Sequence, residues 1–564
     1  MTSTLRRRHG PDVVGRTACR LLACLVPWIA WATVWTGAAV GARITGQAQP
    51  SAAPGMVLVE LSSGSYDWPG GWAWAAAACQ AVCWGIVLSV LVSRLGGRTG
   101  QPHVDRSARF LASRADLRRL GTRETRRSAR SLHPPGIRPP GIHLGRAVRG
   151  KADVWAPWDL SRVEVWGCRT DQTTSRVVPT ILAAPGPLLV TSSGDDALKA
   201  TRADRERVGR VWVFDVHGRS EEPPRCWWNI LSMVGRDPAS AVQVADLFAA
   251  SNRGEHQRSD GYFEPAATQL IALFLLAASL DGRPVTDVRN WLMRRDDATA
   301  HSILTAWGFP AAVRMLEALT QTPEQQREGV FGSAVPMTTF LTNPRIIELL
   351  TPQPGRPELD VAQAVSGGRD TVFVLCAEKD NVASPAATAL TAMFAMASAS
   401  RGARCPRGRL PVPVTLVLDD AAASASWRLW PKKLSHFGSR GVVVHVMLRS
   451  WAQGTAAWGA DGMAELWGSA GVRVCASGMA DPELLDQYSV LAGVFEAPTV
   501  TTGHSGWALW SSVTRASRAE PILRPGDIAA LPAGRALVQI VGSRPVLVHT
   551  ARPHAVRAPR KGRL

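Results

Sequence analysis

The sequence of 564 residues contains only six lysines, and its nine cysteines form no CxxC pair. Cys79 and Cys83 lie inside an apolar run, and no histidines cluster beside the cysteines. We therefore expect neither a disulfide framework nor a zinc site. The shortage of lysine has a second consequence, because a loop that cradles nucleotide phosphates normally depends on one lysine.

Positive charge is nevertheless abundant, and nearly all of it is arginine. Lysine and arginine together number 64 against 45 acidic residues, which leaves a formal net charge of +19. Such an excess favours anionic partners, either nucleic acid or a membrane surface, although charge alone identifies neither. The length is sufficient for roughly two to four domains.

Two apolar runs, 21–42 and 72–93, carry no charge and dominate the first hundred residues. Each is long enough to cross a bilayer as a helix. Arginines precede the first run and follow the second, whereas the segment between them has little positive charge. The sequence thus predicts a membrane region at 1–93 with two transmembrane helices and both termini in the cytoplasm. The alternative is a cleaved signal peptide followed by a single anchor.

Fifteen basic residues lie between residues 94 and 151, against three acidic ones. We interpret 94–150 as a basic cytoplasmic linker. It could bind anionic lipid headgroups or nucleic acid, but a topology signal for membrane insertion explains the same arginines without any partner. At the other end of the chain, 551–564 is a basic tail that we expect to be disordered.

Short β-rich runs separated by helical segments begin after Lys151, including RVEVW, LLVTS, VWVFD, TVFVLC, VTLVL and VVVHVML. Uninterrupted hydrophobic strands that alternate with helices are typical of a parallel sheet covered on both faces. Repeated helix starts with scarcely a strand predict an all-α insert at 238–350. The α/β domain would then consist of two parts, 151–237 and 351–550. We interpret the most apolar helical stretch of the insert, 262–281, as the core helix of the insert.

The stretch WGCRTDQTT at 166–174 follows a predicted strand and precedes a helix, where a phosphate loop of the form GxxxxGK[ST] would lie. Thr173 and Thr174 fit the hydroxyl positions. Asp171 stands at a glycine position and Gln172 at the lysine position, and both changes disfavour a bound triphosphate. Taken alone, the stretch is more typical of an ordinary strand-to-helix turn, because only the hydroxyl position clearly matches the motif.

A second chemical signal is the hydrophobic strand LVL followed by Asp419 and Asp420. A buried strand that ends in two carboxylates is typical of a Walker B pair. The first carboxylate holds a magnesium-bound water, and the second orients the attacking water. The alternative is that these aspartates only form a turn.

Taken in order, these features resemble the TraG/TraD-like coupling proteins of type IV secretion and bacterial conjugation, particularly actinobacterial members. The segments that carry the resemblance are RVVPTILAAPGPLLVTSS (176–193), GRVWVFDVHG (209–218), FEPAATQLIALFLLAASLDGRPVTDVRNWL (263–292), RLPVPVTLVLDDAA (409–422), FGSRGVVVHVML (437–448), WAQGTAAWG (451–459) and GMADPELLDQYSVLAG (478–493). The resemblance implies a RecA-like P-loop NTPase domain with an all-α insert, preceded by a two-helix transmembrane hairpin. It also implies a hexamer that recruits relaxase-bound DNA to a transfer channel of type IV secretion components.

The departures from the family pattern concern the nucleotide. Besides Asp171 and Gln172, Asp420 stands where the family has glutamate and Arg449 where it usually has glutamine. The sequence therefore predicts a noncatalytic pseudo-ATPase that recruits DNA or a relaxase nucleoprotein, or that pairs with an active paralogue. ATP and Mg²⁺, the latter held by Thr173 and Asp419, are expected only if a nucleotide binds.

Three alternatives remain open. An active, unconventional translocase would take its cation from Lys199 or Arg202, and Arg440 would reach a neighbouring subunit as an arginine finger. A structural membrane scaffold would use the insert and the basic linker for contacts alone. A decayed gene product is the third alternative.

Overall fold

The computed structural model describes residues 13–51, 53, 56–96, 102–134, 137–251, 261–366, 368–376, 384–503 and 512–550. The predicted basic tail at 551–564 and the first part of the predicted linker lie outside these residues. The chain divides into two compact units, Met1–Pro102 and His103–Leu564.

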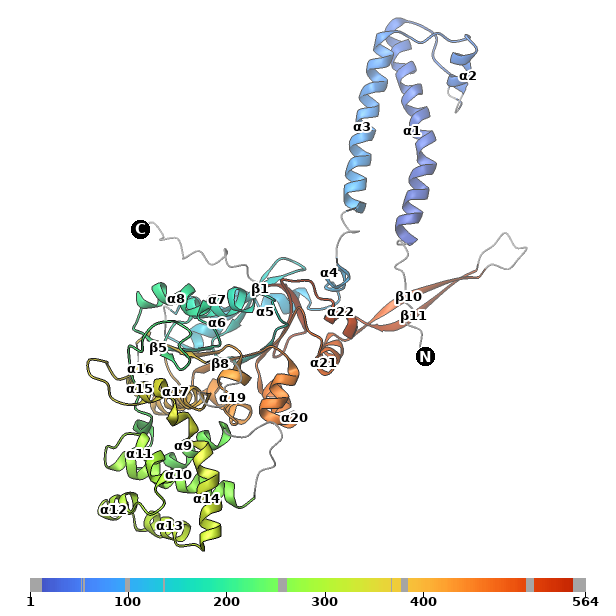
Figure 1. Ribbon diagram of the computed structural model, residues 1–564. Helices are drawn as coiled ribbons and strands as arrows, with labels where there is room; N and C mark the ends of the chain where they lie inside the picture. Colours follow the sequence, from blue (N-terminus) through green and yellow to red (C-terminus); the bar gives the residue numbers. More distant parts are fainter. Residues whose placement is uncertain are drawn as a thin grey trace. The chain divides into compact units, whose positions relative to one another are not determined.

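The first unit is a pair of long helices joined by a short one: α1 (Val13–Thr45), α2 (Met56–Ser62) and α3 (Gly71–Gly96), with α1 and α3 side by side (Figure 1). Glycines let the two long helices approach closely. A Cβ on Gly41 would lie 2.6 Å from the Cβ of Ala73, and one on Gly37 would lie 2.9 Å from the Cβ of Ala77. Small residues at such contacts are typical of closely packed apolar helices.

Among the described residues, length and composition single out one helix that could cross a membrane, α10 (Phe263–Leu280), and 67% of it is buried within the second unit. Gly71–Val87 in α3 is a shorter apolar stretch. The burial of α10 agrees with its interpretation as a core helix. The two predicted spans, 21–42 and 72–93, fall on α1 and α3 but are not established as membrane-crossing.

The second unit is built on an eleven-stranded sheet in the order β2-β1-β13-β12-β9-β3-β8-β7-β4-β6-β5. The strands are β1 (Gly141–Ala147), β2 (Asp153–Pro157), β3 (Arg162–Val165), β4 (Leu188–Ser192), β5 (Val211–Asp215), β6 (Thr371–Leu375), β7 (Val414–Leu418), β8 (Val442–Leu448), β9 (Val472–Ala476), β12 (Arg535–Ile540) and β13 (Val546–His549). A separate two-stranded ribbon pairs β10 (Val494–Gly503) with β11 (Ser512–Pro521).

The sheet is mixed rather than parallel throughout. Pairing is parallel from β9 through β3, β8, β7, β4 and β6 to β5. From β9 to β2 every pairing is antiparallel. The prediction of a parallel sheet thus holds for the part whose strands are linked through helices. The antiparallel edge arises because β1–β2 and β12–β13 are joined by short turns, which can only connect antiparallel neighbours.

Helices cover the sheet and fill the connections between strands. They are α7 (Val178–Ala183), α8 (Asp196–Glu206), α17 (Ser384–Arg404), α18 (Ala421–Ser424), α19 (Trp430–Ser439), α20 (Trp451–Ser469), α21 (Pro482–Ala492) and α22 (Pro525–Ala529). Strands β4, β6, β7 and β8 are buried at every position, as expected for strands covered on both faces.

Between β5 and β6 the regular elements among the described residues are all helices, joined by loops, apart from one isolated bridge. The elements are η2 (Ile230–Met233), α9 (Pro238–Ser251), α10, α11 (Thr286–Met293), α12 (Thr299–Ala306), α13 (Pro310–Thr320), α14 (Glu324–Met337), η3 (Thr339–Thr342), α15 (Pro344–Leu350) and α16 (Val361–Ala364). Twelve side chains of α10 are buried, which makes it the central helix of this group.

Much of the segment interpreted from the sequence as a basic linker is folded. Residues 103–147 form α4 (His103–Ser107), α5 (Arg114–Arg119), α6 (Thr122–Leu132) and β1. Buried residues such as Val104 and Leu144 anchor this segment in the second unit. The sequence did not indicate that this segment is folded, because the few apolar residues of the segment are scattered among arginines, glycines and prolines.

Candidate functional site

Three neighbouring parallel strands deliver the predicted site residues to one edge of the sheet. Strand β8 lies between β3 and β7 and pairs in parallel with both. The carboxyl ends of parallel strands lie at the same edge, where α/β proteins usually bind ligands. The loop after β3 carries Gln172, the residue after β8 is Arg449, and Asp419 and Asp420 follow β7.

The loop after β3 leads into a π-helical turn, η1 (Thr173–Val177), which continues as α7. Asp171 has a left-handed backbone, with φ of 58°. Glycine adopts this conformation freely, whereas other residues are strained there. The carbonyl of Asp171 accepts a hydrogen bond from the backbone N–H of Ser175 at 2.9 Å. At Asp171 the loop therefore has a backbone conformation that suits glycine.

Gln172 binds the first carboxylate of the predicted Walker B pair. Its Nε2 donates a hydrogen bond to Oδ1 of Asp419 at 2.7 Å, and Oγ of Ser192 donates to Oδ2 at 3.3 Å. Burial, with a smaller contribution from neighbouring Asp420, raises the pKa of Asp419 to about 7, although the two hydrogen bonds oppose this shift. The side chain at the lysine position thus supplies no positive charge and is hydrogen-bonded to the carboxylate expected to serve magnesium.

Asp420 has its own partners on the neighbouring elements. Its backbone is left-handed, with φ of 57°. Gln453 donates from Nε2 to Oδ1 at 2.5 Å, and Nη2 of Arg449 lies 3.1 Å from Oδ2. Burial raises the pKa of Asp420, and the bond from Gln453 partly offsets this effect. Arg449 also donates to Oγ of Ser193 at 3.2 Å, so its guanidinium joins the ends of β8, β4 and β7.

A buried charge cluster lies beneath the loop. Arg176 of η1 donates from Nε to Oε2 of Glu164 on β3 at 2.9 Å, and Nε1 of Trp166 donates to the same oxygen at 3.0 Å. Arg162 donates from Nε to Nδ1 of His445 at 2.6 Å and lies 3.6 Å from Glu164. Burial lowers the pKa of Arg162 to about 9 and lowers that of His445 well below its usual value. One carboxylate therefore serves two buried guanidinium groups.

The other end of Arg176 fixes the loop to the antiparallel edge of the sheet. Its Nη1 and Nη2 donate to the carbonyls of His143 and Leu144 on β1 at 3.2 and 3.1 Å. The helix that follows the loop is thus held by charge-assisted hydrogen bonds to β3 and β1.

The remaining predicted site residues, Thr173, Thr174 and Arg440, take no part in the hydrogen bonds to the side chains of Asp419 and Asp420. Thr173 is half-buried at the start of η1, and Thr174 is exposed and donates to the carbonyl of Asp171 at 3.3 Å. Arg440 ends α19 just before β8 begins, so it lies at the opposite edge of the sheet from Asp419. There its Nη1 donates to the carbonyl of Gly408 at 3.1 Å.

The two cations considered as substitutes for the missing lysine are paired elsewhere. Lys199 forms an ion pair with Asp195 at 2.7 Å, one turn away on α8. Arg202 forms ion pairs with Glu206 at 3.0 Å and with Glu222 at 2.6 Å. Within the described part of the chain, neither has an ion pair with Asp419 or Asp420.

These residues do not fit a magnesium triphosphate. A phosphate loop needs a lysine for the terminal phosphates, whereas position 172 holds a neutral amide that is hydrogen-bonded to Asp419. Exposed Asp171 adds negative charge to the same loop.

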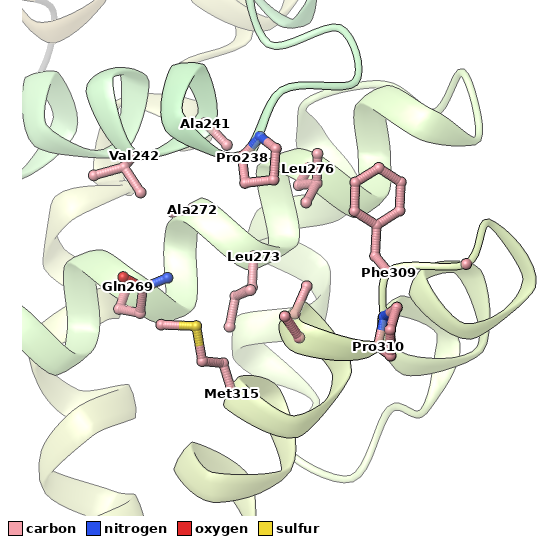
Figure 2. Close-up of a pocket in the computed structure, with 13 residues that line it drawn as sticks. Pro238, Ala241, Val242, Gln269, Ala272, Leu273, Leu276, Phe309, Pro310 and Met315 are labelled. Atoms are coloured by element: carbon pink, nitrogen blue, oxygen red, sulfur yellow. The ribbon is translucent and has the colours of Figure 1, made fainter.

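The insert contains the second feature of interest, an apolar cavity of about 250 Å³. Figure 2 shows Pro238 and Val242 of α9 facing Leu273 of α10 across it, with Phe309 and Met315 on the far side. Gln269 is the only polar side chain that lines it. Such a lining offers no catalytic group.

Sequence reasoning did not assign a role to Ser192, Gln453, Glu164 or Arg176. Gln453 lies in the quoted segment WAQGTAAWG, but no local pattern connects it with a carboxylate 33 residues earlier. Glu164 interrupts a hydrophobic strand that is buried throughout. A charged residue in such a strand was the available signal, because buried charges are normally paired.

Comparison with known proteins relates the part of the chain that contains Asp419 and Asp420 to a known family. Residues 413–533, roughly a fifth of the chain, match the family described as the TraM recognition site of TraD and TraG. This segment runs from β7 and the two aspartates through β8 and β9 to the residues after α22. No curated protein matches the sequence.

Solved structures extend the similarity to most of the chain. The bacterial conjugative coupling protein TrwBΔN70, in its unbound monoclinic form, has a TM-score of 0.53 at 14% identity, covering 77% of this chain and 91% of that one. Plasmid coupling protein TrwB in complex with the non-hydrolysable ATP analogue ADPNP has a TM-score of 0.53 at 15% identity, with coverage of 75% and 91%. The fold is therefore the RecA-like α/β fold of P-loop NTPases. The predicted resemblance to TraG/TraD-like coupling proteins is confirmed by these structures together with the segment match.

Proposed function

We propose that this chain is a membrane-anchored coupling-protein homologue of a conjugative or type IV secretion system, and that it acts as a noncatalytic pseudo-ATPase. In this role it recruits DNA or a relaxase nucleoprotein, or it pairs with an active paralogue in a hexamer. The hydrogen bond between Gln172 and Asp419 carries the proposal, because it pairs the neutral amide at the predicted lysine position with the carboxylate predicted to serve magnesium.

The membrane anchor is the pair α1 and α3, with both termini in the cytoplasm. Among the residues whose side chains the structure describes, ten of the twenty exposed large hydrophobic ones lie between residues 28 and 87, including Trp72 and Trp74 at 64% and 66% exposure. Exposed apolar surface of this extent is unfavourable in water, and insertion into a bilayer removes it from water. The proposed domain organisation keeps the membrane region at 1–93 and the insert at 238–350, between the two parts of the RecA-like domain.

A transfer assay tests the proposal. The gene is deleted in its host, and transfer is measured after complementation with wild type, Asp419→Asn or Asp420→Asn. We expect deletion to abolish transfer and both variants to restore it, because a noncatalytic site does not use these carboxylates for hydrolysis. Normal transfer after deletion contradicts the coupling role, whereas failure of both stably produced variants contradicts the noncatalytic role.

A second candidate is an active translocase with an unconventional cation, and one observation favours it. Arg449 is 41% exposed and lies 3.1 Å from Asp420, so a guanidinium is present at the site edge. This candidate predicts that ATP hydrolysis is measurable in wild type and lost in Arg449→Ala. The noncatalytic proposal predicts that hydrolysis is absent from both.

A further inference from the structure

An arginine-rich surface lies on the second unit, on helices α5 and α6 and on two turns beside them. On α6, Arg123, Arg126, Arg127 and Arg130 are all exposed. Their spacing of three and four residues places them on one helical face. The opposite face packs on β1: a Cβ on Gly141 would lie 2.6 Å from Cγ2 of Thr125, which is buried. The arginines therefore form the outer face of a helix whose inner face is fixed.

Other chain segments extend this face. Arg114, Arg118 and Arg119 of α5 are exposed. The β1–β2 turn packs against α5, since a Cβ on Gly150 would lie 3.5 Å from Cδ1 of Leu117. The β12–β13 turn is joined to the start of this region by a hydrogen bond from the N–H of Ala112 to the carbonyl of Pro545 at 3.1 Å.

We define the basic surface as the exposed basic residues of these segments: Arg114, Arg118, Arg119, Arg123, Arg126, Arg127, Arg130, Arg149, Lys151 and Arg544. Asp116 and Glu124 are the acidic residues on α5 and α6. Among the described residues, the side chains of Arg114, Arg118 and the four arginines of α6 have no hydrogen-bond or ion-pair partner. Concentrated, unneutralised guanidinium groups are suited to phosphate oxygens.

A topology signal for membrane insertion does not account for this arrangement. Such a signal acts through basic residues within about 15–20 residues of a membrane helix. Arg149, Lys151 and Arg544 lie more than 50 residues beyond Gly96, the end of α3, yet the fold brings their turns beside α5. Three-dimensional clustering of residues so distant in sequence indicates a binding surface.

We propose that the basic surface binds the phosphate headgroups of anionic phospholipids. This inference rests on the proposed membrane anchor, because only six residues of the sequence separate Gly96, the last residue of α3, from His103, the first residue of α4. Nucleic acid is the less favoured partner. Neither α5 nor α6 contains an aromatic residue on which a base could stack.

The test uses the full-length chain in nanodiscs of phosphatidylcholine, alone or mixed with phosphatidylglycerol, and measures amide hydrogen exchange of residues 114–132. We expect exchange to be slower with phosphatidylglycerol and the protection to fade as salt rises. In the variant Arg123→Gln, Arg126→Gln, Arg127→Gln, Arg130→Gln, the protection should fall about tenfold or more. The matched control replaces exposed Arg207, Arg294, Arg295 and Arg314 by Gln and should keep it.

Equal exchange of residues 114–132 in both lipids overturns the inference. Protection by a DNA duplex in phosphatidylcholine nanodiscs, without protection by phosphatidylglycerol, also overturns it and assigns the surface to nucleic acid. A chain that does not enter nanodiscs at all contradicts the membrane anchor of the proposed function. In that case, sedimentation with phosphatidylglycerol vesicles tests the basic surface alone, and a failure to sediment contradicts the inference.

Discussion

Gln172 and Asp419, 247 residues apart in sequence, are joined by a 2.7 Å hydrogen bond at the edge of the sheet where a nucleotide would bind. Gln172 stands at the position that the sequence predicts for a phosphate-loop lysine, and Asp419 stands at the position predicted to serve magnesium. Each side chain therefore has a partner within the protein. In a functional loop the same two positions meet through the nucleotide and its metal.

The first prediction concerns the pH dependence of Asp419. In the folded chain this carboxyl keeps its proton up to about pH 7, whereas in an unfolded chain it loses the proton near pH 3.9. Between these values the folded state binds one more proton, so the free energy of unfolding falls as pH rises from about 4 to about 7. Asparagine does not titrate, so Asp419→Asn should remove this pH-dependent fall in the free energy of unfolding. The variant should be more stable than wild type at pH 8 by up to about 4 kcal/mol.

Thermal unfolding in detergent at pH 4.5 and pH 8 measures this effect. The advantage of Asp419→Asn should be large at pH 8 and roughly fourfold smaller at pH 4.5. Asp461→Asn, at an exposed position of α20, is the matched control and should change stability little at either pH. An advantage of Asp419→Asn that is the same at both values contradicts the raised pKa.

The second prediction concerns the buried cluster beneath the loop. Glu164→Gln removes the carboxylate that serves Arg162 and Arg176, and it leaves two buried guanidinium groups uncompensated. We expect a loss of about 3–5 kcal/mol in the free energy of unfolding. Chemical denaturation measures it against Glu465→Gln on the exposed face of α20. Equal effects of the two substitutions would show that the cluster does not stabilise the fold.

The third prediction addresses the ion pair between Arg449 and Asp420. A double-mutant cycle of Arg449→Ala and Asp420→Asn should give a coupling energy of about 1–2 kcal/mol, because Asp420 is only 2% exposed. The same cycle on exposed Lys199 and its partner Asp195 should give a smaller coupling energy, because the lysine is in contact with solvent. Additive effects at Arg449 and Asp420 would show that the guanidinium does not stabilise the carboxylate.

The fourth prediction concerns the packing of α1 against α3. A leucine at position 41 would bring its Cβ to 2.6 Å from Ala73, so Gly41→Leu should separate the helices. Hydrogen exchange of residues 37–45 should become faster. At Gly85 a Cβ would meet nothing within 4 Å, so Gly85→Leu is the control and should leave exchange unchanged. Equally slow exchange in both variants contradicts the close packing.

The sequence predicted the features that depend on local patterns. Strand LVL with its two aspartates was recognisable because a hydrophobic run ends abruptly in charge. The insert helix α10 was recognisable because its apolar stretch includes Glu264 and Gln269, which disfavour a membrane span. Both patterns reflect burial, which acts on neighbouring residues in the chain.

The rest depended on contacts between distant segments. Strand β1, GIHLGRA, lies in an arginine-rich and glycine-rich region and reads as a linker until Arg176 and β13 are seen beside it. Likewise, nothing near Gln453 indicates that it donates to Asp420. The sequence also did not indicate that Gln172 donates to Asp419. The identity of residue 172 predicted only that no lysine is present there to bind the terminal phosphates.

The central claim is that the nucleotide site is closed by the residues at positions 171 and 172. Calorimetry of magnesium-dependent ATP binding to the full-length protein, beside the variant Asp171→Gly, Gln172→Lys, tests it most directly. We predict no binding by wild type and measurable binding by the variant, because the left-handed loop at position 171 accepts glycine and a lysine at 172 restores the charge. ATP binding by wild type would contradict the account.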